Sequence, residues 1–282
     1  MQVVHQKSEL RELVHVIRSQ NKSIGFVPTM GYLHQGHLSL IRRARQENDV
    51  VMVSVFVNPT QFGPNEDLDA YPRDTPRDLD LLEAERTDVA FFPSVEELYP
   101  EDFTTYVAVE GPMTQVLCGR SRPTHFRGVT TIVTKLFHLV DPQRAYFGQK
   151  DAQQVVVLQQ MVRDLDFDLE MVICPTVREA DGLAISSRNA YLTPDQRAQA
   201  PGIARALFEA RELITNGERR AQKIVDHLHK RITDIDSAVI DYVSITDASS
   251  LKEVDVLDGQ VLIAVAVKLG RTRLIDNIRV AV

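Results

Sequence analysis

The chain has 282 residues, of which 44% are hydrophobic and 25% charged, and its formal net charge is −7. This length and composition predict a globular protein of about two domains with a substantial core. The negative charge argues against a nucleic-acid partner, which normally requires a basic surface. Residues 1–18 lack a signal-peptide pattern, and the longest apolar runs, such as residues 261–267, are too short to span a bilayer. We therefore expect neither a nucleic-acid partner nor a membrane partner.

The two cysteines, Cys118 and Cys174, lie far apart in the sequence and form no C-x-x-C pattern. Cysteines in this arrangement are more often reduced, buried thiols than metal ligands or catalytic nucleophiles. Free thiols persist in a reducing compartment. The cysteines therefore favour a cytoplasmic protein.

Residues 1–176 alternate between short apolar runs rich in β-branched residues and amphipathic stretches. In chain order we predict a strand at 24–27, a helix at 38–45, a strand at 50–57, a helix at 78–86, a strand at 89–92, a helix at 129–140, a strand at 145–147, a helix at 152–165 and a strand at 169–174. Strands that are apolar on both faces and separated by helices form parallel sheets covered on both sides. The pattern predicts a Rossmann-like, doubly wound α/β fold, in which ligands bind beyond the carboxyl ends of the strands.

The pattern changes near residue 176. The later segments are an irregular polar stretch at 175–189, a mostly helical region at 194–224, and strands at 239–245, 261–267 and 273–279 that are joined by turns. We therefore predict a first domain of residues 1–176 and a smaller α+β domain of residues 177–282.

Two histidines follow the first predicted strand, where a glycine-containing loop becomes a helix. His34, Gly36 and His37 form an H-x-G-H pattern there. The first backbone N–H groups of a helix attract phosphate, and two imidazoles three residues apart can face one phosphoryl oxygen or leaving group. The spacing of Gly31 and Gly36 also matches a P-loop, but His37 and Leu38 replace the lysine and the hydroxyl residue that such a loop requires. The segment also lacks the G-x-G-x-x-G pattern of a dinucleotide site.

Three further polar loops lie at or beyond the ends of predicted strands. Gln61 offers a donor and an acceptor suited to a small hydroxy acid, although its neighbours are also ordinary turn residues. Lys150 can contact a phosphate, or it can lie exposed beside the helix-capping residue Asp151. The two serines and the arginine of residues 181–189 suit a triphosphate in a mobile lid, or the segment is a solvated linker.

Four acidic residues in the same half of the chain offer a different kind of ligand. Asp67, Asp69, Asp78 and Asp80 can help to hold Mg²⁺, but a solvated acidic face is the simpler expectation. We therefore assign no metal ligand from the sequence.

These loops together resemble those of the pantothenate synthetases, the AMP-forming pantoate–β-alanine ligases. The family pattern P-T-M-G-A-L-H-x-G-H matches residues 28–37, N-P-x-Q-F matches 58–62, G-E-K-D-x-x-Q matches 148–154, and R-E-x-D-G-L-A-M-S-S-R-N matches 178–189. H-x-G-H alone is shared by a superfamily of nucleotidyltransferases, whereas the combination is specific. The resemblance covers essentially the whole chain.

Three positions depart from the family patterns. Tyr32 stands in place of alanine, Gln149 in place of glutamate and Ile185 in place of methionine. We expect Tyr32 to narrow the nucleotide loop and Ile185 to reshape the adenine pocket slightly. Gln149 removes a negative charge beside Lys150, and the sequence does not indicate whether this change favours or opposes ATP binding.

The resemblance implies roles for individual residues. His34 and His37 stabilise the phosphates during adenylation, His37 is also a candidate proton donor, and Lys150 and Arg188 complete the catalytic set. The implied ATP-binding residues are Met30, Gly31, Tyr32, Leu33, His34, Gln35, Gly36, His37, Gly148, Gln149, Lys150, Asp151, Val177, Ile185, Ser186, Ser187 and Arg188. The implied pantoate- and β-alanine-binding residues are Gln61 and Gln154.

The resemblance further implies the reaction, the cofactors and the assembly. ATP and Mg²⁺ drive the condensation of (R)-pantoate with β-alanine to pantothenate, a coenzyme A precursor, through a pantoyl adenylate. AMP and pyrophosphate are released. The family is dimeric, and its C-terminal domain acts as a lid.

Two other functions stay open on the residues alone. An adenylyltransferase that acts on a phosphate ester, such as nicotinamide mononucleotide or phosphopantetheine, would share H-x-G-H. Its anionic acceptor would call for additional arginines or lysines, and residues 58–63 are uncharged. A non-enzymatic sensor of adenine nucleotides would bind ATP without needing Gln61 and Gln154 near the α-phosphate.

Overall fold

The computed structural model describes residues 1–64 and 66–282, and the contacts between residues divide the chain into two compact units. Unit 1 consists of Met1–Glu110, Arg122–Gly148 and Val157–Pro175, and unit 2 consists of Gly111–Ser121, Gln149–Val156 and Thr176–Val282. The long segment of unit 2 begins next to the boundary expected from the sequence. The sequence does not indicate that the two short segments belong to unit 2, because only long-range packing places them in that unit. That residues 177–282 fold as a separate domain stays a prediction.

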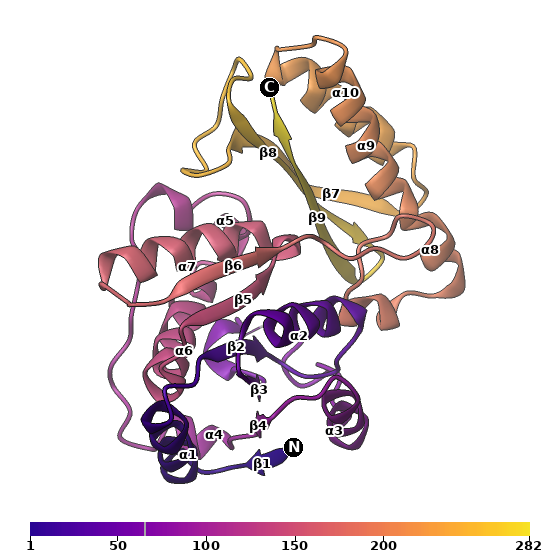
Figure 1. Ribbon diagram of the computed structural model, residues 1–282. Helices are drawn as coiled ribbons and strands as arrows, with labels where there is room; N and C mark the ends of the chain where they lie inside the picture. The colour runs from indigo at the N-terminus through magenta and orange to yellow at the C-terminus, as the bar shows by residue number, and fades with distance from the viewer. Residues whose placement is uncertain (65) are drawn as a thin grey trace. The chain divides into compact units, whose positions relative to one another are not determined.

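Unit 1 contains a six-stranded parallel sheet with the order β1-β4-β3-β2-β5-β6 (Figure 1). Its strands are β1 (Gln2–Val4), β2 (Ile24–Thr29), β3 (Val50–Val55), β4 (Val89–Phe91), β5 (Arg144–Gly148) and β6 (Glu170–Cys174). The predicted parallel α/β sheet is confirmed. The sequence patterns missed β1, because its three residues are too few for a periodic signal.

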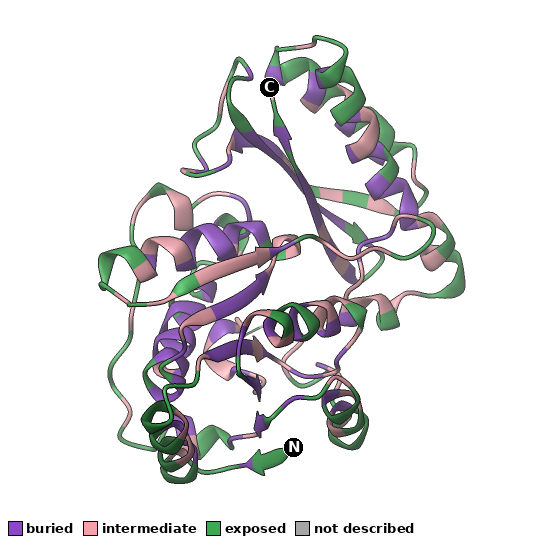
Figure 2. Ribbon diagram, viewed as in Figure 1, coloured by how far each residue is buried: buried purple, intermediate pink, exposed green. Residues whose placement is uncertain are grey.

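Helices cover both faces of this sheet. They are α1 (Lys7–Ser19), α2 (Gln35–Glu47), α3 (Thr75–Ala84), α4 (Val95–Leu98), α6 (His125–Val140) and the later part of α7 (Ala152–Asp164). Val27 belongs to an apolar cluster with Leu38 and Ile41 of α2, whereas the ring centroid of Phe26 lies 6.4 Å from that of Phe137 of α6. Neighbouring residues of a strand point to opposite faces, so α2 and α6 lie on opposite sides. The central strands are correspondingly buried (Figure 2).

Unit 2 contains a three-stranded antiparallel sheet with the order β7-β8-β9. Its elements are α5 (Cys118–Ser121), α8 (Pro194–Gln199), α9 (Pro201–Thr215), α10 (Ala221–Thr233), β7 (Ala238–Asp247), β8 (Gln260–Leu269) and β9 (Thr272–Ala281). Ile263 packs in one apolar cluster with α9 and α10, and Leu262 packs in a second cluster with Leu117, Ala152 and Val156. The two short segments of unit 2 therefore cover the sheet face that α9 and α10 leave open.

The single helical region predicted at 194–224 is three helices in the structure, and the last of them continues to Thr233. Within the parts of the chain that the structure describes, no helix combines the length and the apolar character needed to cross a membrane.

Candidate active site

The loop after β2 is fixed at its start by the side chain of Thr29, the last residue of the strand. Thr29 Oγ1 donates to the carbonyl oxygen of Ser54 at 2.8 Å and accepts from the backbone nitrogen of Gly31 at 3.2 Å. Gly31 has a φ of +80°, and a Cβ there would lie 2.9 Å from Cγ1 of Val55. Glycine is therefore required at this position, both for its conformation and for space.

A buried carboxylate holds the next two residues of this loop. Asp78 of α3 is 1% exposed, and its oxygens accept from the backbone nitrogens of Tyr32 at 2.8 Å and Leu33 at 2.7 Å. Burial raises the pKa of Asp78 above its usual range, although the two N–H groups act in the opposite direction. The expectation of a solvated acidic face is therefore wrong for Asp78, because its side chain fastens the loop. Beside it, the guanidinium carbon of Arg77 lies 5.4 Å from the centroid of the Tyr32 ring.

His34 and His37 lie at the start of α2, as the H-x-G-H pattern predicts. His34 Nδ1 accepts from the backbone nitrogen of Gly36 at 3.2 Å, and His37 Nδ1 accepts from the backbone nitrogen of His34 at 3.4 Å. The two rings stack with centroids 4.1 Å apart. Because Nδ1 is the acceptor in both rings, the proton of each neutral imidazole is assigned to Nε2.

Gly36 leaves room for the ring of His34. A Cβ at this position would lie 2.9 Å from Cε1 of His34, so a larger residue would push the His34 ring from its place. The H-x-G-H turn thus presents two N–H donors of imidazole rings beside the positive end of a helix, which is an arrangement suited to phosphate.

Gln61 and Met30 come from two different predicted loops, and the structure brings them together. Gln61 lies in the short helix η1 (Pro59–Gln61) that follows β3. Its Oε1 accepts from Asn58 Nδ2 at 3.2 Å, and its Nε2 donates to the sulfur of Met30 at 3.0 Å. A thioether is a weak acceptor, so a hydroxyl or carboxylate of a ligand is a better partner for Nε2.

The main chain of Gln61 is held by two residues that the sequence analysis missed, one in the first turn of α6 and one just before that helix. His125 Nδ1 lies 3.0 Å from the carbonyl oxygen of Gln61, and Arg122 Nη2 donates to the same oxygen at 3.3 Å. Arg122 also binds both carboxylate oxygens of Glu66, at 2.8 and 2.5 Å. The sequence indicated candidate site residues by their position after predicted strands. Neither Arg122 nor His125 follows a predicted strand.

The Arg122–Glu66 pair shifts the titration of the carboxylate. Burial by itself would raise the pKa of Glu66, but the hydrogen bond and the positive charge of Arg122 outweigh it. The pKa of Glu66 is therefore below its usual range, and the pair stays charged at neutral pH.

In unit 2, residues 177–185 form a tight hairpin that ends at the predicted serine and arginine residues. Arg178 and Ala184 pair as an antiparallel bridge, the backbone nitrogen of Ile185 donates to the carbonyl oxygen of Val177 at 3.0 Å, and Gly182 turns with a φ of +94°. Ser186 then caps the short helix η4 (Ser187–Tyr191), with its Oγ accepting from the backbone nitrogen of Arg188 at 3.3 Å. The segment is thus an ordered turn that carries Ser186, Ser187 and Arg188 at its end.

Lys150 and Gln154 occupy the other part of unit 2 that the sequence indicated. Lys150 lies in the short helix η3 (Gln149–Asp151), with Nζ 4.0 Å from Oδ1 of Asp151. Gln154 lies half-buried in the first turn of α7. The neighbouring Gln153 is committed to structure, because its side chain bonds the main chain of Cys118, Met113 and Val116.

The predicted site residues therefore divide between the units. Those of unit 1 are Met30, Gly31, Tyr32, Leu33, His34, Gln35, Gly36, His37, Gln61 and Gly148. Those of unit 2 are Gln149, Lys150, Asp151, Gln154, Val177, Ile185, Ser186, Ser187 and Arg188.

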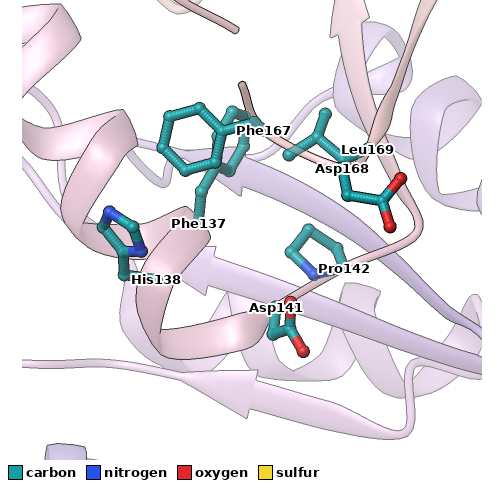
Figure 3. Close-up of a pocket in the computed structure, with 7 residues that line it drawn as sticks. All are labelled: Phe137, His138, Asp141, Pro142, Phe167, Asp168 and Leu169. Atoms are coloured by element: carbon teal, nitrogen blue, oxygen red, sulfur yellow. The ribbon is translucent and has the colours of Figure 1, made fainter. Parts of the chain in front are cut away.

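A cavity of about 350 Å³ in unit 1 is lined by none of these residues. Phe137, Pro142, Phe167 and Leu169 contribute to its lining (Figure 3). Pro142 precedes β5 and Leu169 precedes β6, so this cavity is at the amino ends of the strands. Ligands of doubly wound sheets bind at the opposite, carboxyl ends, where the H-x-G-H turn and η1 follow β2 and β3.

A parallel sheet covered on both faces, with an H-x-G-H turn after its central strand, defines an α/β enzyme that acts on a nucleotide. The sequence profile of the family Pantoate-beta-alanine ligase matches residues 2–279. The chain is 57% identical to the pantothenate synthetase of Acetivibrio thermocellus over 282 residues, which is 100% of both chains. It is also 57% identical to that of Thermotoga petrophila over 277 residues, covering 98% of this chain and 99% of the relative.

Solved structures give the same result. The crystal structure of pantothenate synthetase from Thermus thermophilus matches with a TM-score of 0.94 and 47% identity over 99% of each chain. The pantoate-beta-alanine ligase of Francisella tularensis, in complex with beta-gamma ATP and beta-alanine, matches with a TM-score of 0.80 and 33% identity over 99% of this chain and 97% of that one. The chain belongs to the pantoate–β-alanine ligase family. It ligates pantoate to β-alanine with ATP as cosubstrate, which decides against the phosphate-ester adenylyltransferase and the sensor.

Proposed function

We propose that the ligation runs in two steps through a pantoyl adenylate. A carboxylate oxygen of pantoate attacks the α-phosphorus of ATP, and the bond to pyrophosphate breaks. The amine of β-alanine then attacks the acyl carbon, loses a proton, and the carbon–oxygen bond to AMP breaks. A free carboxylate has no adequate leaving group at neutral pH, whereas an acyl adenylate releases AMP. Such a path needs charge stabilisation and positioning more than a covalent nucleophile.

The observation that carries this proposal is the pair of imidazoles at the start of α2. In the assigned tautomer, His34 and His37 each hold a proton on Nε2, beside the N-terminus of a helix. Donors placed where negative charge develops stabilise the transition state of phosphoryl attack. We assign both imidazoles to the phosphates of ATP, and His37 to the additional role of proton donor.

The residues of the other predicted segments take the triphosphate and the adenosine. Lys150 and Arg188 supply positive charge to the triphosphate, together with the hydroxyls of Ser186 and Ser187. Gly148 and Val177 contact the adenosine through their backbone, as the family resemblance implies. The hairpin geometry supports this role, because it ends in two hydroxyls and a guanidinium in succession.

Gln61 and Gln154 bind the hydroxyls and the carboxylate of pantoate. The weak contact between Gln61 Nε2 and the sulfur of Met30 supports this assignment, because pantoate oxygens are stronger acceptors. Asn58 fixes the other end of the Gln61 amide, so the orientation of that amide is set before a substrate binds.

Mg²⁺ is proposed to enter with ATP rather than at a site of the free chain. Within residues 1–64 and 66–282, no group of three or more histidine, cysteine, aspartate or glutamate side chains is placed to hold a metal ion. Mg²⁺ is commonly held by substrate phosphates, water and at most one or two carboxylates, a mode that requires no cluster of protein ligands. There it would neutralise phosphate charge.

The assembly and the location also remain proposals. We propose a homodimer on the family resemblance. We propose a cytoplasmic location, which suits the two cysteines, since both Cys118 and Cys174 are free and buried.

The deciding experiment is isotope exchange between ATP and pyrophosphate, with β-alanine omitted. Exchange that depends on pantoate establishes the adenylate, because only a reversible first step returns label to ATP. Ligation without any such exchange would contradict a first step that forms the adenylate and releases pyrophosphate before β-alanine binds.

A further inference from the structure

Asn277, on β9, uses both donor hydrogens and the acceptor oxygen of its side-chain amide within unit 2. Its Nδ2 donates to the carbonyl oxygens of Gln149 at 3.1 Å and Lys150 at 2.9 Å. Its Oδ1 accepts from Gln149 Nε2 at 3.0 Å. The residue is 4% exposed, so these bonds are shielded from water. One side chain therefore fixes two consecutive peptide groups of η3.

Asp276, the residue before Asn277, holds the other segment of unit 2 that is assigned to ATP, namely the hairpin that ends at Ser186. The buried carboxylate of Asp276 binds the guanidinium of Arg178 at 2.6 and 2.9 Å. Arg178 in turn donates to the carbonyl oxygen of Gly182 at 3.1 Å, across the hairpin that ends at Ser186. Two adjacent residues of β9 thus anchor the segment of Lys150 and the segment of Arg188.

We propose that Asn277 is a positioning residue for the ligase reaction, and that it acts by fixing the main chain from which the Lys150 side chain extends. The proposal rests on the assignment of Lys150 to the triphosphate and goes beyond it. A lysine ammonium sits at the end of four flexible carbons, so its average position depends on where its backbone is held. Misplacing a charge that stabilises the transition state slows the chemistry.

Gln149, which stands where the family pattern has glutamate, has a structural role in this arrangement. The amide of Asn277 must point its NH₂ group toward two carbonyl oxygens, and the donor Gln149 Nε2 faces its remaining oxygen. A carboxylate at residue 149 in the same place would set two acceptors against each other. Gln149 therefore selects the orientation in which Asn277 can bind both carbonyl groups.

The test compares isosteric variants in steady-state kinetics and in pantoate-dependent exchange. Asn277→Asp replaces the two donors by an acceptor and removes the hydrogen bond that each of the two carbonyl groups receives from residue 277. We expect kcat/KM for ATP to fall at least about tenfold, with KM for pantoate unchanged. Gln149→Glu loses only one hydrogen bond, and we expect a smaller decrease. Ile224→Val, in the other apolar cluster of unit 2, is the control for lost stability and should leave kcat/KM for ATP unchanged.

A double-mutant cycle with Lys150→Ala separates positioning from general damage. If Asn277 acts through Lys150, Asn277→Asp should reduce kcat/KM for ATP little further once Lys150 is absent. Equal effects in both backgrounds would overturn the proposal, as would a normal kcat/KM for ATP in folded Asn277→Asp. A normal kcat/KM in Lys150→Ala would instead overturn the assignment of Lys150, and with it the positioning role. Should Asn277→Asp fail to fold, Gln149→Leu carries the same cycle, because Gln149 is only half-buried.

Discussion

The carboxylate of Asp78 lies 2.7 Å from the backbone nitrogen of Leu33, the residue that precedes the H-x-G-H motif. Leu33 is fully buried, and the same carboxylate binds the backbone nitrogen of Tyr32. The approach of the loop to α2 is therefore set from another helix, 45 residues away in the chain. The orientation of His34 depends on this fastening as well as on its own hydrogen bonds.

Asp78→Asn should slow adenylation while the fold persists. An asparagine has one acceptor oxygen, so its NH₂ group would face one of the two backbone N–H groups, and an unpaired buried donor costs about 1–3 kcal/mol. We expect pantoate-dependent exchange to fall about tenfold or more. Asp80→Asn, an exposed residue of the same helix, is the matched control. Equal activity of the two variants would show that the loop keeps its shape without the carboxylate.

His37→Ala should remove most of the adenylation activity. Removal of one preorganised donor to a developing negative charge typically reduces kcat about 10²–10³-fold. Exchange of label between ATP and pyrophosphate measures the loss, and circular dichroism checks the fold. His138→Ala, at an exposed histidine of α6, should behave as the unmodified protein. Near-normal turnover in folded His37→Ala protein would refute the role given to this imidazole.

Gly128→Ala should weaken pantoate binding more than ATP binding. A Cβ at this position would lie 2.4 Å from the carbonyl oxygen of Thr60 and 2.5 Å from the backbone nitrogen of Gln61, so η1 must move. Overpacking of this kind costs about 1–3 kcal/mol, and we expect an increase in KM for pantoate. Gly63→Ala lies in the same segment, and its added Cβ would come no closer than 3.5 Å to its nearest neighbour, the Glu66 side chain. A larger effect from Gly63→Ala would contradict the packing argument.

Glu66→Gln should make the free energy of unfolding depend less on pH in the acid range. The pKa of Glu66 is lowered in the folded state, so its pair with Arg122 contributes fully above the unfolded pKa, near 4.5, and the contribution is lost as pH falls through the folded value. Urea unfolding from pH 7 to pH 3 measures this difference. We expect the variant to be about 1–3 kcal/mol less stable at neutral pH and to converge on the unmodified protein in acid. Parallel curves would show that this pair does not set the pH dependence.

The sequence predicts features of unit 1 that arise from neighbouring residues. The apolar runs around Phe26 and Val53 and the H-x-G-H pattern are local, and the structure has the expected strands and helix start at these places. The expectation for Asp78 was wrong and His125 was missed, because their partners lie 45 and 64 residues away and no local pattern encodes such pairings. The assignment of the individual residues to ATP and pantoate stays a prediction until the variants are measured.

The helices of unit 2 begin and end at positions that the sequence pattern did not predict. The helical region at 194–224 is interrupted because Pro201 begins α9 and Gly217, with a φ of +101°, follows its end. In unit 1, helix α1 is amphipathic but was not predicted, because it lies before the first predicted strand.

Unit 2 is assembled from three stretches of chain, and this limits how the protein can be cut, fused or synthesised. Leu117 and Ala152 pack in one cluster with Leu262, which the ribosome makes more than a hundred residues after either of them. During synthesis those early apolar side chains have no native partner until β8 emerges. A fragment that ends at residue 175 would keep them exposed and prone to aggregation. The C-terminal hundred residues are therefore not a cassette that can be exchanged between relatives on their own, and a chimera must carry residues 111–121 and 149–156 with them.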